Sequence, residues 1–154
     1  MDISPFDDNH FMRQALIEAQ KAFDMDEVPV GAVIVCNQKI IARAHNFTER
    51  LNDFTAHAEM QAFTSASEYL GSKYLNNCII YITLEPCIMC AGASFWTRIG
   101  KIVFGAPDEK RGYQRLKENI HCLTLRLHPV WLFLRTANSF TLLKDIILKE
   151  DQLS

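Results

Sequence analysis

The chain has 154 residues, 49% of them hydrophobic, and a formal net charge of −2. This length suits one globular domain, so we expect a single domain over residues 1–154. No run of about 18 apolar residues is present and the N-terminal stretch is acidic, which argues against a membrane span and an export signal. Five cysteines, an odd number, favour a reducing compartment, and we expect a cytoplasmic protein. The small net charge excludes a globally basic surface, so a polyanion would have to meet a local patch.

The first half of the chain predicts a helix, a hairpin and a second helix. Apolar side chains recur at helical spacing over residues 6–23. Two runs rich in β-branched residues, 28–36 and 39–44, are separated by two polar residues, which is typical of a β-hairpin. After a polar loop, residues 57–70 have a helical pattern that ends at Gly71.

Strands and helices alternate in the second half. The pattern predicts strands at 78–84, 101–105 and 130–134, helices at 87–98 and 139–150, and a long irregular connection at 106–129. Such alternation implies parallel strand pairing with helices covering the sheet. The sequence therefore predicts an α/β fold, a three-layer αβα sandwich with a mixed five-stranded sheet.

Cys87 and Cys90 follow Pro86 at the start of the helix predicted at 87–98. Their spacing puts both thiols on one helix face, where the helix N-terminus stabilises the thiolate form that metals require. His57, at the start of another predicted helix, is the natural third ligand. Three protein ligands leave one tetrahedral position for water, which distinguishes a catalytic zinc from a structural one. We therefore predict one Zn²⁺ ion held by His57, Cys87 and Cys90.

Glu59 lies two residues after His57, in the same predicted first turn. A zinc-bound water has a pKa of about 7, and its proton must be carried to a leaving group. Glu59 can reach this water without binding the metal, so we predict that it is the catalytic proton shuttle. A C-x-x-C pair alone is compatible with a redox pair or half a structural site, and an H-x-E motif alone is close to noise. The combination is far more specific.

Four segments of the sequence resemble one known family: 27-EVPVGA-32, 55-TAHAE-59, 83-TLEPCIMCAGA-93 and 98-RIGKIVFGA-106. They are similar to the tRNA-specific adenosine deaminases of the bacterial TadA type, within the zinc-dependent cytidine/nucleobase deaminase superfamily. The resemblance implies a cytidine-deaminase-like fold, usually as a homodimer. It also implies hydrolytic deamination of adenosine to inosine at the wobble (first anticodon) position of a tRNA.

The resemblance also implies roles for residues around the zinc site. Asn46 would hydrogen-bond the base, and the backbone N–H of Ala58 would face the purine edge. Val30 would line the pocket, and Asp108 would contact the nucleic acid near the flipped base.

Basic side chains outnumber acidic ones between residues 98 and 117, which forms a local basic patch. Within it, Lys110 and Arg111 are predicted to contact the anticodon stem-loop of the tRNA. A solvated charged face is the alternative on charge alone. Tyr113, among these charges, is equally compatible with stacking on a base and with packing on the core.

Two other functions remain open. A deaminase of free nucleobases or nucleosides, of the guanine or cytosine type, would use the same zinc chemistry. A catalytically inactive, zinc-stabilised RNA-binding module would also keep the metal ligands. The basic patch argues against the first alternative, and Glu59 argues against the second, because a structural zinc site has no use for a carboxylate beside an open position.

Overall fold

The computed structural model describes residues 6–115 of the chain. Its elements, in chain order, are α1 (Asp8–Asp24), β1 (Gly31–Cys36), β2 (Lys39–His45), α2 (Thr48–Leu51), α3 (Ala58–Leu70), β3 (Cys78–Leu84), α4 (Ile88–Thr97) and β4 (Lys101–Ala106). The strand predicted at 130–134 and the helix predicted at 139–150 lie outside the described residues. Within the described part, no helix is long and apolar enough to cross a membrane.

The sheet is mixed, as predicted, with strand order β2-β1-β3-β4. β1 pairs antiparallel with both β2 and β3, whereas β3 and β4 are parallel because α4 crosses over between them. Asn37 and Gln38 join β1 to β2, and both have positive φ (49° and 62°). This geometry is that of the two-residue hairpin turns whose twist matches the strands. Residues 6–115 thus contain four of the five predicted strands.

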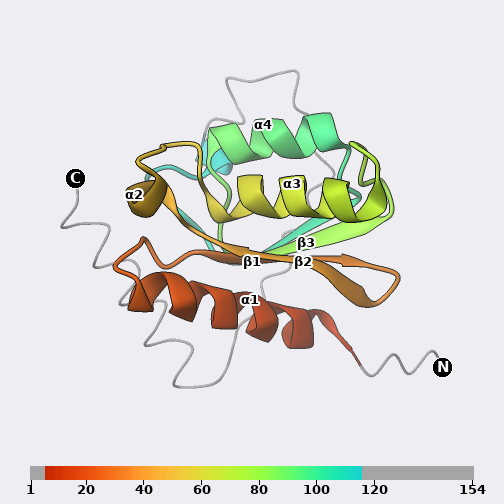
Figure 1. The fold of residues 1–154 in the computed structure, drawn as a ribbon, viewed down its shortest axis with the longest axis horizontal. Coiled ribbons are helices and arrows are strands. Elements are labelled where there is room, and N and C mark those ends of the chain that lie inside the picture. The colour runs from red at the N-terminus through yellow and green to blue at the C-terminus, as the bar shows by residue number, and fades with distance from the viewer. Residues whose placement is uncertain (1–5, 116–154) are drawn as a thin grey trace.

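The sheet carries helices on both faces (Figure 1). Alternate residues of β1 and β3 point to opposite sides, so each face has its own apolar cluster. On one face, α1 packs its buried Phe11, Met12 and Ala15 against side chains that include Val33 and Tyr81. On the other face, a larger cluster joins α3 to the sheet through residues that include Ala58, Ala62, Ala32, Ile34, Ile80 and Ile82. The arrangement confirms the predicted three-layer αβα sandwich.

The helices on the second face begin at two residues of the predicted metal site. His57 is the N-cap of α3 and Cys87 the N-cap of α4, and both have extended backbone (ψ 155° and 173°). Neither side chain caps its own helix. Both side chains therefore remain available to a ligand at the helix N-termini.

Candidate active site

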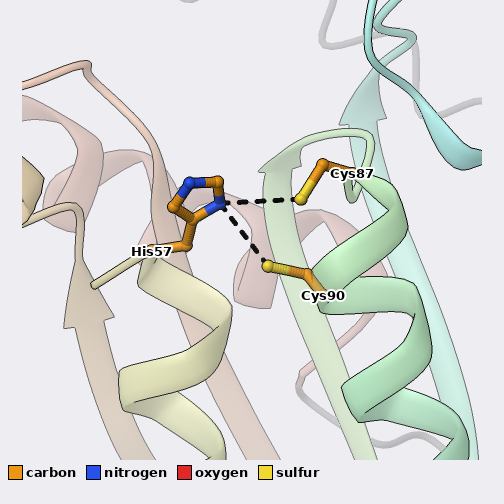
Figure 2. Close-up of side chains that lie close together, drawn as sticks. All are labelled: His57, Cys87 and Cys90. Carbon is orange, nitrogen blue, oxygen red and sulfur yellow. Dashed lines mark hydrogen bonds between the residues drawn. The ribbon is translucent and has the colours of Figure 1, made fainter. Parts of the chain in front are cut away.

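The N-termini of α3 and α4 bring His57, Cys87 and Cys90 together (Figure 2). Nδ1 of His57 lies 3.7 Å from Sγ of Cys87 and 3.6 Å from Sγ of Cys90. The three donor atoms all lie within 4.8 Å of one another. Zn–S bonds of about 2.3 Å and Zn–N bonds of about 2.0–2.1 Å at a tetrahedral centre place N and S roughly 3.6 Å apart. The donor set and its spacing thus fit a zinc ion, and the cluster can hold a metal.

The two thiols of this cluster differ in the direction in which their pKa values are shifted. The pKa of Cys87 is lowered to about 4, first by a hydrogen bond from the Cys90 thiol and then by its contact with His57. The pKa of Cys90 is raised well above its usual value, because its proton is shared with Cys87 and because the thiol is buried. The hydrogen bond with Cys87 also raises the pKa of His57. Since a metal needs both thiolates, metal binding must displace a proton from Cys90.

Glu59 lies in the first turn of α3 and is only 4% exposed. Burial raises the pKa of its carboxyl to about 7. A carboxyl whose pKa is near the working pH can both accept and donate a proton, which is what general acid–base catalysis requires. Glu59 also lines the cavity beside the His57 and Cys87 side chains. Its position thus suits the predicted proton shuttle.

A cavity of about 330 Å³ opens beside the cluster, within the size range of small-molecule sites. The predicted site residues that line it are Val30, Asn46, His57, Glu59, Cys87, Asp108 and Arg111. Three others do not: Cys90 and Ala58 are buried, and Lys110 lies on an exposed turn. Ala58 is the first residue of α3, so its N–H belongs to the helix turn that has no intrahelical acceptor.

The cavity wall also contains residues that the sequence prediction missed, namely Val28, Thr48, Glu49, Phe54, Leu84 and Glu85. Leu84 and Glu85 fall inside the segment 83-TLEPC-87, so the motif itself signals them. Thr48 and Glu49 belong to the short helix α2, which has too few residues to show a periodic pattern. Nothing in the sequence marks Phe54 as a cavity residue, except that it is an aromatic residue in a polar loop.

A buried carboxylate outside the cavity fixes one wall of the site. Glu27 is 2% exposed and accepts hydrogen bonds from Nδ2 of Asn46 (3.0 Å) and from the backbone N–H groups of Glu49 (3.1 Å) and Arg50 (2.8 Å). Asn46 also donates to Oγ1 of Thr48 (2.9 Å). The Asn46 amide and the start of α2 are therefore held by one side chain.

A second buried carboxylate, Glu85, holds the loop that carries the basic residues. It accepts hydrogen bonds from the backbone N–H of Asp108 (3.1 Å) and of Gln114 (3.0 Å). Tyr113 donates its backbone N–H to the carbonyl of Pro86 (3.0 Å), and its side chain is buried. Of the two possibilities for Tyr113, the structure therefore shows packing on the core. The loop is tied directly to the start of α4.

Known proteins match this chain over most of its length. A model of the MafB19-like deaminases matches residues 6–149. The tRNA-specific adenosine deaminase of Aquifex aeolicus is 52% identical over 103 residues, which cover 67% of this chain and 68% of that protein. The chain belongs to the MafB19-like deaminase family. The family resemblance predicted from its motifs is thereby confirmed.

Solved structures of deaminases agree with this assignment. One, from a study of A-to-I editing by tRNA:A34 deaminases at the wobble position of transfer RNA, is 48% identical with a TM-score of 0.68 and covers 70% of this chain and 78% of that chain. Guanine deaminase from Bacillus subtilis is 36% identical with a TM-score of 0.64, covering 66% of each chain. The chain is thus similar both to a protein from the study of tRNA:A34 deaminases and to a guanine deaminase.

Proposed function

We propose that this deaminase converts adenosine to inosine at the wobble (first anticodon) position of tRNA by zinc-dependent hydrolysis. The observation that carries the proposal is the buried Glu59 beside His57, Cys87 and Cys90 at a nucleoside-sized cavity. The similarity to the Aquifex aeolicus tRNA-specific adenosine deaminase, at 52% identity, supports adenosine in tRNA as the substrate.

His57, Cys87 and Cys90 would hold the zinc ion, which would supply a Lewis acid that makes water nucleophilic at neutral pH. Glu59 takes up one proton from the water and delivers it to the ring nitrogen; it then takes up the proton of the hydroxyl group added to the carbon and delivers it to the departing amine, which leaves as ammonia. Its buried carboxyl, with a pKa of about 7, is suited to both directions of transfer.

The base must leave its stack to enter the cavity, because the reacting carbon is inaccessible inside a stacked loop. Asp108 and Arg111 line the cavity from the loop that Glu85 holds. Asp108 accepts backbone hydrogen bonds from Lys110 (3.0 Å) and Arg111 (2.9 Å), which fixes the start of the turn. We propose that Lys110 and Arg111 contact phosphates of the anticodon stem-loop, while Asn46, Val30 and Ala58 bind the nucleoside.

We propose that the protein acts as a homodimer. Three apolar side chains on α4 share one helix face because of their spacing, namely Ile88, Phe95 and Trp96, and Trp96 is 77% exposed. An exposed apolar face of this kind on a small domain supports association with a second copy.

We also propose that residues 1–154 form one domain and that the reaction occurs in the cytoplasm, where the thiols of Cys87 and Cys90 remain reduced.

A single competition assay tests the function. Zinc-loaded protein is given a tRNA with adenosine at the first anticodon position, the same tRNA with guanosine there, and free adenosine, guanine, cytosine and cytidine. Inosine at that anticodon position, and no comparable product from the others, is expected. Turnover of free guanine alone would support the guanine-deaminase alternative, which the B. subtilis relative favours at 36% identity. Binding of the tRNA without any product would support an inactive module.

A further inference from the structure

Phe54 is the most exposed large apolar side chain of the described residues, with 94% of its surface accessible, and it also lines the catalytic cavity. A single exposed phenylalanine is ordinary on a protein surface. This one differs because it stands at the rim of the site that holds His57 and Glu59. Within residues 6–115, no other aromatic ring stacks on it.

The backbone on either side of Phe54 is fixed by hydrogen bonds. The carboxylate of Asp53 accepts from the backbone N–H (2.8 Å) and the hydroxyl (2.7 Å) of Thr55. The N–H of Asp53 donates to the carbonyl of Thr48 (3.0 Å), and the N–H of Ala56 donates to the carbonyl of Asp53 (3.1 Å). Phe54 therefore projects from a tight turn that leads into His57. The backbone that carries the ring therefore loses little conformational freedom on binding.

The chemistry of the substrate points to what this ring meets. An adenosine inside a nucleic acid is joined to a nucleotide on each side, so its neighbours must lie near the cavity mouth when the base is inserted. Unstacked bases of single-stranded loops are commonly received by aromatic side chains, whose planar faces replace the lost stacking. Arg111 lines the same cavity and has no ion pair within the described part of the chain, so it can meet a phosphate.

We propose that Phe54 is a stacking platform for the base of a nucleotide adjacent to the target adenosine. The inference rests on the proposed function, because it requires a polynucleotide substrate. It adds a specificity element to that function: an RNA substrate would gain binding energy from the flanking base that a free nucleoside lacks.

Three variants and one control test the proposal by single-turnover deamination of a short anticodon stem-loop RNA. Phe54→Ala is expected to raise the half-saturating protein concentration by roughly 5- to 150-fold, with a smaller effect on the maximal rate. Phe54→Leu, which is apolar but has no planar face, should behave more like Phe54→Ala, and Phe54→Tyr should remain close to wild type. Tyr69→Ala removes another exposed aromatic ring near the C-terminal end of α3 and should have no effect.

Two modified RNAs identify the stacked base. Each carries an abasic residue, one on the 5′ side of the adenosine and the other on the 3′ side. On the RNA that lacks the stacked base, Phe54→Ala is expected to have the same half-saturating protein concentration as wild type. On the RNA that lacks the opposite neighbour, the variant is expected to show the same increase as on the intact RNA. Sedimentation and thermal unfolding of Phe54→Ala should match wild type.

The proposal is overturned if Phe54→Ala binds and deaminates the intact RNA as wild type does, or if its defect persists undiminished on both abasic RNAs. It is also overturned if the defect follows a change in oligomeric state, which would place the ring against a second protein chain. Failure of the wild-type protein to deaminate any stem-loop would instead contradict the proposed function, so the two failures are distinguishable.

Discussion

The buried carboxylate of Glu27 accepts a 3.0 Å hydrogen bond from the side-chain amide of Asn46. Asn46 donates its second amide hydrogen to Oγ1 of Thr48 (2.9 Å), so both N–H groups of the amide are used. A carboxylate can only accept, which fixes the orientation of the amide and leaves Oδ1 as its remaining group for a substrate. Asn46 is thereby set to accept a hydrogen bond in the cavity. Glu27 does not line the cavity, so we propose that it influences the substrate through Asn46 and through the start of α2.

This relationship predicts strong coupling between Glu27 and Asn46. Glu27→Gln can also present its own N–H groups, so it no longer enforces one amide orientation, and kcat/KM on tRNA should fall. Loss of a hydrogen bond to a charged group costs about 1.5–3 kcal/mol, which corresponds to roughly 10- to 150-fold. Asn46→Ala should cause a similar loss, and the double variant should lose little more than either single one. Additive losses in this cycle would contradict the positioning role, and zinc content serves as the control.

A second prediction separates the metal from the proton transfer. Glu59→Ala should keep its zinc, because Glu59 is not one of the three clustered ligand groups. It should lose about 10²- to 10⁴-fold in turnover, which is the usual contribution of a positioned general acid–base. His57→Ala should lose zinc and activity together. Bound zinc, thermal stability and inosine formation are measured in both variants. If Glu59→Ala loses zinc as readily as His57→Ala does, then Glu59 is a ligand or a structural support of the site and not a proton shuttle.

The ionisation of the two thiols predicts how zinc binding depends on pH. Wild-type protein should contain about one zinc per chain. The pKa of Cys87 is about 4, so Cys87 is already a thiolate at neutral pH, whereas Cys90, with its raised pKa, keeps its proton until the metal binds. Protons therefore compete with zinc, and affinity should rise as the pH increases from about 6 to about 8. Chelator competition at several pH values measures this, and an affinity independent of pH would contradict the ligand assignment.

The basic loop predicts a salt-dependent contact with RNA. Neutralising Lys110 and Arg111 together should weaken binding of the tRNA and flatten the dependence of log K on log salt. Each phosphate contact contributes a slope of roughly −0.7 to −0.9. Binding measured over a range of salt concentrations tests the prediction, with Lys73→Gln, on an exposed residue beyond α3, as the control. An unchanged slope in the double variant would show that the loop is simply a solvated charged face.

The sequence predicts features that depend on local patterns and leaves out those that depend on contacts through space. β3 begins and ends where its apolar run does, and α3 ends at the predicted Gly71, which has the left-handed conformation expected of a helix C-cap. The ligand residues are recognisable because each motif is contiguous. In contrast, α2 is four residues long and is held by Glu27, a residue more than twenty positions earlier. Phe54 acquires its significance only when the fold places it at the cavity.

Gly112 and Gly92 provide a matched pair of glycine substitutions with opposite expected effects. A Cβ atom at Gly112 would lie 2.5 Å from the carbonyl oxygen of Asp108 and 2.5 Å from Cδ of Glu85. Real Cβ atoms do not approach backbone this closely, so Gly112→Ala must displace either the loop or the carboxylate that holds it. In contrast, a Cβ at Gly92 meets nothing within 4 Å, and Gly92 lies inside α4, where alanine is favoured by about 0.8–1.0 kcal/mol.

We therefore expect Gly112→Ala to raise KM for tRNA, because Asp108 and Arg111 shift with the loop. An isolated β-bridge joins Gly112 to Cys87, so zinc content is measured in the same variant to separate a displaced loop from a displaced ligand. Gly92→Ala should raise the melting temperature and keep its zinc. Gly92 lies four residues from both Ile88 and Trp96, on the α4 face proposed for the homodimer, so sedimentation of this variant is measured as well. Steady-state kinetics, zinc analysis and thermal unfolding of both variants test this pair. If Gly112→Ala has wild-type KM, then the loop does not position the substrate, and the contact between Glu85 and Asp108 serves the stability of the fold alone.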